Sequence, residues 1–134
     1  MNVLEARRTF WEKVTALHQF HHIAAARKGW AADRHARHYY DVYQLSKADD
    51  ADNWINDVHL LGDVVHFKAI FFKDPKARWD EAKRGSLRLV PQEQAVEKLR
   101  ADYESMREYF TGERPQWSAV ITALSELEER VNQM

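Results

Sequence analysis

The sequence contains no cysteine and only 4 glycines and 3 prolines among its 134 residues. The absence of cysteine excludes disulfides and thiolate metal sites and fits a reducing compartment, so we expect a cytoplasmic protein. The shortage of glycine and proline disfavours a β fold with many tight turns and favours long helices.

A strong net charge and long apolar runs are also missing. The net charge is −1 at pH 7, so the overall electrostatics do not indicate a nucleic-acid-binding surface. The most apolar run, Val64 to Phe72, is interrupted by His66 and Lys68 and is too short to span a bilayer. The N-terminal stretch lacks the apolar core of a secretory signal. We therefore expect no association with membranes.

The remaining composition is typical of a soluble globular domain, with 45% hydrophobic and 31% charged residues. The length indicates one domain, residues 1–134. The spacing of apolar residues predicts helices over 7–27, 37–47, 52–73, 76–83, 91–110 and 116–132, with Gly62 as the expected kink or break in the helix over 52–73. Residues 86–90 alternate like a strand but have no partner strand, so we expect an extended connector. The predicted fold class is all-α: a single-domain bundle of four to five main helices with a short extended connector.

Aromatic residues recur at helical spacing along the predicted helices, which assigns most of them to the core. They are Trp54, Phe67, Phe71, Phe72, Trp79, Tyr103, Tyr109, Phe110 and Trp117.

The segment from Arg37 to Leu45 concentrates candidate functional side chains, with three tyrosines, an arginine, a histidine and an aspartate in nine residues. A helix that is apolar on nearly all sides is usually buried, and a buried aspartate needs a partner. Arg37 stands four residues before Asp41, and Lys13 falls inside the apolar stripe of the preceding helix. Lys13 is either a boundary lysine that snorkels to solvent or a point charge for a phosphate group. The predicted ligand-binding set is Lys13, Arg37, His38, Tyr40 and Asp41.

His18 and His22 stand four residues apart on one helix face, a spacing that some zinc sites use. The pair lacks a clear third ligand and the intervening glutamate of helical zinc motifs. Solvated or core-edge histidines are the favoured interpretation, and we predict no metal site.

Two segments together resemble a known family. Residues 7–18 and 37–45 look like the third conserved block of the AbiEii/AbiGii toxin family nucleotidyltransferases. Further matching pieces are His66–Lys68 with Phe71–Phe72, Gly85–Pro91, Asp102–Tyr103 with Met106, and Leu124–Asn132. The family is similar to polymerase-β-type nucleotidyltransferases, and its members transfer nucleotides to RNA acceptors. The resemblance implies that Lys13 contacts a triphosphate and that Asp41 is the acid of the catalytic pocket.

The resemblance also shows what the given sequence does not contain. The family's N-terminal half carries a Gly-Ser motif and metal-binding carboxylates, whereas this sequence begins just before the third block. Position 38 is His where many relatives have Asp. Because nucleotidyl transfer depends on divalent metals, we expect a protein that is not catalytic alone. No cofactor is implied beyond a weakly bound nucleotide, and Mg²⁺ only with a catalytic half.

Three hypotheses follow. In the first, the chain is a helical interaction module that keeps an anion-, nucleotide- or RNA-binding wall and pairs with a second copy or with a nucleotidyltransferase-like protein. Exposed Phe10, Trp11, Tyr39 and Tyr43 would then supply the contact surface of a homodimer. In the second, the chain is an antitoxin-like structural protein in which Lys13 and Asp41 form a relict ion pair. In the third, it is one half of a nucleotidyltransferase that a separately encoded catalytic half completes.

Overall fold

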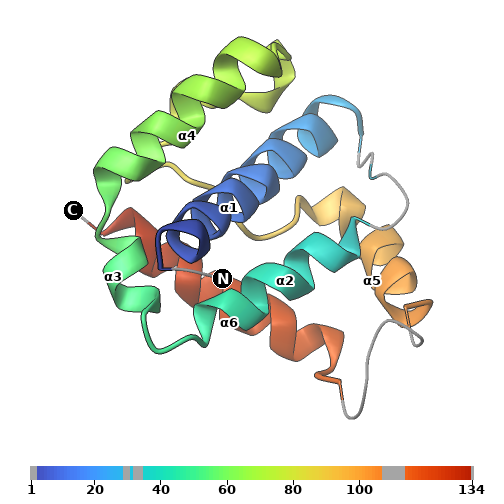
Figure 1. Cartoon of the computed structure of the whole chain (residues 1–134). Coiled ribbons are helices and arrows are strands. Elements are labelled where there is room, and N and C mark those ends of the chain that lie inside the picture. Colours follow the sequence, from blue (N-terminus) through green and yellow to red (C-terminus); the bar gives the residue numbers. More distant parts are fainter. Residues whose placement is uncertain (1–2, 29–30, 32–34, 107–113, 134) are drawn as a thin grey trace.

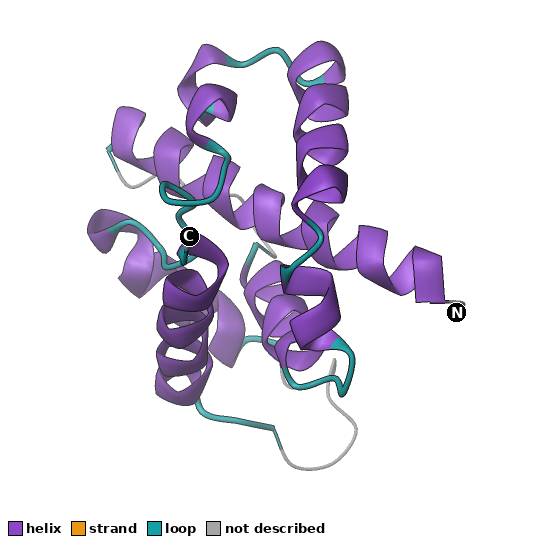
Figure 2. Ribbon diagram, turned by 90° about the vertical axis from the view of Figure 1, so that its left-hand side faces the viewer, coloured by secondary structure: helices purple, strands orange, loops and turns teal. Residues whose placement is uncertain are grey.

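A 24-residue helix, α1 (Val3–Ala26), passes through the middle of the molecule (Figure 1). The structure is a computed structural model that describes residues 3–28, 31, 35–106 and 114–133. Phe10, Val14 and Leu17 of α1 are fully buried, as their spacing predicts, and Trp11 is fully buried beside them. α4 and the turns after it lie on one side of α1, and α2, α5 and α6 lie on the other (Figure 2).

Helices α2 (Ala36–Ser46), α5 (Val96–Glu104) and α6 (Trp117–Asn132) form the larger part of the core with α1. Tyr39 and Val42 of α2 are buried, and the Tyr39 ring meets Trp117 of α6 edge-on at 5.9 Å. Tyr103 of α5 packs on the same tryptophan, with ring centroids 5.3 Å apart. The described residues contain helices and no strand, which confirms the all-α prediction.

The predicted helix over 52–73 is divided, and the predicted break at Gly62 is wrong. α3 (Ala51–Ile55) ends before Asn56, and α4 (Val58–Phe71) begins after Asp57. The Asp57 carboxylate accepts a hydrogen bond from the Leu60 N–H at 3.0 Å, so this residue caps α4. Gly62 lies inside α4 with open space around it, and the helix runs through it.

Two other predicted helices are shorter than expected. The segment predicted as a brief helix over 76–83 forms two 3-10 turns, η1 (Pro75–Ala77) and η2 (Trp79–Glu81), separated by Arg78 in the left-handed region at φ 53°. The helix predicted over 91–110 starts as the 3-10 turn η3 (Glu93–Ala95) and continues as α5. Tyr109 and Phe110 lie outside the described residues.

The connector between η2 and η3 contains no strand, as predicted, and side chains of α6 satisfy its backbone. The Asn132 carboxamide accepts from the N–H groups of Gly85 and Leu87 and donates to the Leu87 carbonyl, at 2.9–3.0 Å. The Glu128 carboxylate accepts from the Leu89 N–H at 2.8 Å. Leu87 and Leu89 are fully buried, so these contacts hold two core residues in place.

The expected apolar contact surface on α1 and α2 is absent. Phe10, Trp11, Tyr39 and Tyr43 are at most 8% exposed, which contradicts the prediction that they form an exposed patch. α3, α5 and α6, together with the α1–α2 contact itself, cover them.

The exposed apolar surface lies on α4 instead. Phe67, Phe71 and Phe72 are 46–65% exposed, so these three are exceptions to the prediction that most aromatic residues belong to the core. Only one side of α4, with Leu61 and Val64, is buried against the rest of the molecule, although the helix is apolar on most of its faces.

Substituting Asn132→Ala should lower the free energy of unfolding by about 2 kcal/mol, because it leaves two backbone N–H groups and one carbonyl without their partner. Chemical denaturation of the variant measures this loss. The exposed neighbour Gln133 provides the control, and Gln133→Ala should change stability by less than about 0.5 kcal/mol. Equal stability of the two variants would show that the Asn132 contacts do not hold the connector.

Candidate functional site

A cavity of about 360 Å³ lies between α1 and α4 and reaches His38 of α2. We call it the α1–α4 groove. Its charged lining residues are Arg8, Glu12, Lys13 and Lys68, and its apolar lining residues are Ala16, Val64, Phe67 and Phe72. The groove therefore combines three cations and one carboxylate with an apolar wall.

Lys13 and Asp41 join the first two helices at the edge of this groove. The Lys13 ammonium lies 3.1 Å from the Asp41 carboxylate, and the two side chains are 28% and 24% exposed. Asp41 thus has the lysine partner that its position in α2 requires. The pair fixes the Lys13 side chain beside the groove, at the boundary between core and solvent.

Lys68 brings a second ammonium group to the groove from α4. Its Nζ donates a hydrogen bond to the Glu12 backbone carbonyl at 2.7 Å and lies 5.8 Å from the Trp79 ring centroid. Burial lowers the pKa of Lys68 to about 8, and the nearby Lys13 adds to the lowering. Arg8 and Lys13 each pair with a carboxylate, of Glu12 and Asp41 respectively. The hydrogen bond of Lys68 to the Glu12 backbone instead goes to a neutral carbonyl oxygen.

His38 completes the polar part of the groove. Burial lowers its pKa, and the positive charge of Lys13 lowers it further, so the imidazole is neutral at pH 7. Its Nδ1 is buried and has no hydrogen-bond partner among the described residues. A neutral imidazole at this position can donate to or accept from a bound molecule.

The predicted ligand-binding residues of α2 do not all face this groove. His38 lines it, and Asp41 is beside it through Lys13. Tyr40 lies on the opposite flank of the helix, where its ring stacks with Tyr43 at 6.3 Å. Two positions along a helix correspond to a rotation of about 200°, so His38 and Tyr40 cannot face one groove. Arg37 is exposed on α2 and does not line the cavity.

Residues 1–126 match the family model described as nucleotidyl transferase AbiEii toxin, type IV toxin–antitoxin system. The chain belongs to the AbiEii nucleotidyl transferase toxin family. The match covers nearly the whole chain and confirms the resemblance seen in its first two helical segments. Comparison with curated proteins and with solved structures gave no match.

Of the two candidate metal-binding histidines of this AbiEii-family chain, His18 is held by the backbone and His22 lies beside it. His18 is fully buried; its Nε2 lies 2.9 Å from the Arg78 carbonyl oxygen and its Nδ1 accepts from the Arg88 N–H at 3.1 Å. Both ring nitrogens of His18 are therefore used. His22 lies beside it, with ring centroids 4.6 Å apart, and its Nε2 is 4.0 Å from the Glu81 carboxylate. Across the described ranges, no three His, Asp or Glu side chains are grouped so that they could hold a metal.

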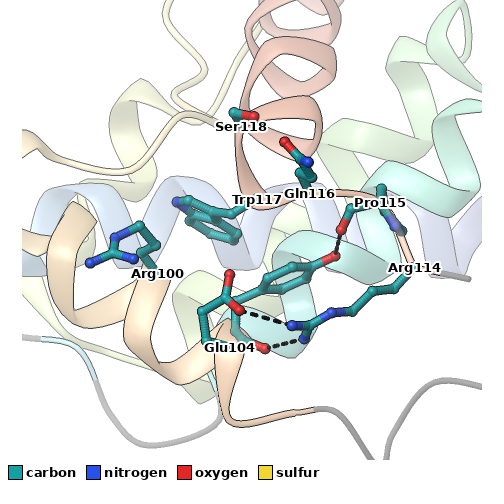
Figure 3. Close-up of a pocket in the computed structure, with 8 residues that line it drawn as sticks. Arg100, Glu104, Arg114, Pro115, Gln116, Trp117 and Ser118 are labelled. Atoms are coloured by element: carbon teal, nitrogen blue, oxygen red, sulfur yellow. Dashed lines mark hydrogen bonds and ion pairs between the residues drawn. The ribbon is translucent and has the colours of Figure 1, made fainter.

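A second cavity, of about 440 Å³, lies where α5 approaches the N-terminus of α6 (Figure 3). Arg100 and Arg114 line it, but each is paired with a carboxylate: Arg114 with Glu104 at 2.8 Å and Arg100 with Glu97 at 2.9 Å. Figure 3 shows the Arg114 guanidinium directed at Glu104 rather than into open space. Because its charges are balanced, this cavity is a weaker candidate in the AbiEii-family chain than the α1–α4 groove. In the part of the chain that is described, no helix has the length and apolarity to cross a membrane.

Stability of this AbiEii-family protein should fall with acid. The folded state lowers the pKa of His18, and it lowers those of His22 and His35 to about 4, mainly through burial. Below pH 6.5 the unfolded chain therefore binds more protons than the folded one, so the contribution of these groups is full above pH 6.5 and is lost as the pH falls toward 4. Denaturation at about pH 7.5 and about pH 5 should show a loss of about 2 kcal/mol for each of His22 and His35.

The variant His22→Gln should show a shallower pH dependence of stability over the same range. The exposed His59 of α4 supplies the control, and His59→Gln should keep the slope of the parent. A slope that His22→Gln leaves unchanged would show that this histidine does not produce the acid sensitivity.

The coupling between Lys13 and Asp41 can be measured with a double-mutant cycle of Lys13→Met and Asp41→Asn. We expect a coupling free energy of about 1 kcal/mol, because the pair is well formed but a quarter exposed. Chemical denaturation of the four proteins gives the value. A coupling free energy near zero would mean that the ion pair contributes no stability.

Proposed function

We propose that this chain is a helical binding module of the AbiEii nucleotidyl transferase family, acting in the cytoplasm, and that its α1–α4 groove binds the phosphates of a nucleotide or of RNA. The observation that carries the proposal is the approach of Lys13 and Lys68, from two different helices, to one cavity. Two ammonium groups beside one cavity are suited to a polyphosphate, which spreads its charge over several oxygens. By its resemblance to the family, Lys13 occupies the position of the lysine that contacts a triphosphate.

The apolar wall supports a nucleotide or RNA rather than an inorganic anion. Phe67 and Phe72 line the cavity and are about half exposed, so their rings are accessible to a base. Stacking of a base on an aromatic ring adds affinity without sequence preference. Asp41 keeps Lys13 ordered, which lowers the entropy lost when a phosphate binds.

The proposed role is binding. Nucleotidyl transfer of the polymerase-β type relies on carboxylates that hold divalent metals. The described residues offer no group of acids or histidines suited to such a metal, and the proposal is therefore limited to binding. A catalytic chain that supplies those carboxylates is a natural partner for a family described as nucleotidyl transferases. The same description names a toxin–antitoxin system and so suggests an antitoxin as a partner.

A second candidate function is that of an antitoxin-like structural protein without a ligand. The ion pair of Lys13 with Asp41 favours it, because the pair satisfies both charges without a phosphate. The two candidates differ in the role of Lys68. It contacts a bound anion under the first, and under the second it only bonds to the Glu12 carbonyl.

Calorimetric titration with ATP and with inorganic triphosphate separates the two candidates. Under the proposal both ligands bind, and Lys13→Ala and Lys68→Ala each weaken binding about tenfold or more, the loss of one charged contact. Lys47, exposed on the far flank of α2 above the Tyr43 ring, is the matched control, and Lys47→Ala should bind like the parent. Equal losses in all three variants, or no binding to the parent, would refute the proposal.

Proton linkage gives an independent measurement on the parent protein. A bound polyphosphate stabilises the charged form of Lys68 and raises its pKa from about 8. Binding near pH 8 should therefore take up protons, which titration in buffers of different ionisation enthalpy detects. The Lys68→Ala variant should lose most of this uptake. Uptake of equal size in the variant would assign it to another group.

A further inference from the structure

The outer side of α4 exposes a continuous set of large apolar side chains. Phe67, Ile70, Phe71 and Phe72 are 46%, 47%, 65% and 54% exposed, and we call them the α4 aromatic face. The Phe67 and Phe71 rings already contact each other, with centroids 4.5 Å apart. Figure 1 shows α4 along the edge of the molecule, with α1 beside it and no other long helix over its outer side.

The composition of α4 indicates that this face is normally covered. Asp63 and Lys68 are its only residues with a full charge, and a helix that is apolar on most sides is usually buried. The exposed apolar area of the α4 aromatic face is about 400 Å², from the size of the side chains and their exposed fractions. Contiguous patches of this size usually mark interaction sites.

We propose that the α4 aromatic face docks against the same face of a second copy of this chain and forms a symmetric homodimer. The size of the surface supports this occupant. A standard interface buries about 800 Å² on each partner, of which roughly 65% is apolar in homodimers. The α4 aromatic face supplies most of that apolar part, and neighbouring polar residues supply the rim.

The charges around the face support a second copy as the occupant. Asp63 precedes the face and Lys73 follows it, and both side chains are exposed. When the two-fold axis is perpendicular to α4 the two helices run antiparallel, and a crossing near Lys68 then sets the Asp63 of each copy beside the partner's Lys73. A strongly charged partner of another kind would instead be matched by rim side chains that all carry the opposite charge. The net charge of −1 causes little repulsion between copies.

The dimer does not depend on anion binding in the groove. Phe67 and Phe72 belong to both surfaces, so the dimer covers the two rings that could otherwise stack on a base, whereas Lys13 and Lys68 lie on the groove side and stay available to phosphate. The oligomeric state can therefore be measured without ligand, and failure of either proposal leaves the other standing.

Light scattering coupled to size exclusion, from about 5 to about 200 μM chain, tests the dimer. The parent should approach twice the chain mass as concentration rises. Phe71→Asp should stay at the chain mass, because it places a charge inside the apolar contact. Val58 is 43% exposed on the same helix but far from the face, so Val58→Asp is the matched control and should dimerise like the parent.

The absence of cysteine allows a second test. In the variant Phe67→Cys a short bismaleimide should join the two copies through this position, whereas in Val58→Cys it should not. A parent that stays monomeric over the whole range overturns the proposal. A dimer that persists in Phe71→Asp also overturns it, because the contact must then lie on another surface. Equal crosslinking of the two cysteine variants overturns it for the same reason.

Discussion

Burial of α1 on nearly every side is the constraint on which the rest of the structure depends. The buried polar groups of a central helix are cut off from water, so they need hydrogen-bond or ionic partners on neighbouring elements. Lys13 meets Asp41 of α2, and the Glu12 carbonyl accepts a hydrogen bond from Lys68 of α4. The His18 ring meets the backbone at Arg78, before η2, and at Arg88, within the connector. Trp11 does the same for α3, since its indole N–H donates to the Trp54 carbonyl at 2.9 Å. The polar residues of α1 thus fix the position of the elements around it, in addition to the apolar contacts.

The α1–α4 groove follows from the same constraint. α4 touches α1 along one side only, and the lysine in its apolar sequence reaches across to a carbonyl of α1. That contact leaves a charged amine in surroundings dry enough to lower its pKa. Membership in the AbiEii family gives this arrangement a chemical context, because nucleotidyl transferases handle polyphosphates. The proposed binding of an anion in the groove rests on the ammonium groups of Lys13 and Lys68.

Periodicity predicts α1, α2 and α6 well because each buries a clear stripe, such as Val120, Leu124 and Leu127 of α6. It fails at α4, where apolar residues occupy most sides and the pattern cannot say which side a neighbour covers. It also places the α3–α4 break at the glycine, because the cap formed by Asp57 is a local hydrogen bond with no periodic signal. Within the site, Lys13 and Asp41 are predictable as polar residues among apolar ones. The place of Lys68 in the site depends on α4 lying next to α1, which the sequence pattern does not reveal. That His38 and Tyr40 face different sides depends on how α2 is rotated against its neighbours, which the pattern does not reveal either.

The contacts of the connector with α6 have a consequence for the order of folding. The Leu87 backbone is bonded to Asn132, 45 positions later, and the Leu89 backbone to Glu128, 39 positions later. Contacts over such separations form only after a large loop closes, which slows folding. During synthesis the connector cannot reach its final state until residues 128–132 have left the ribosome. Until then Leu87 and Leu89 stay accessible, and this segment is where we expect a chaperone or a protease to meet the nascent chain.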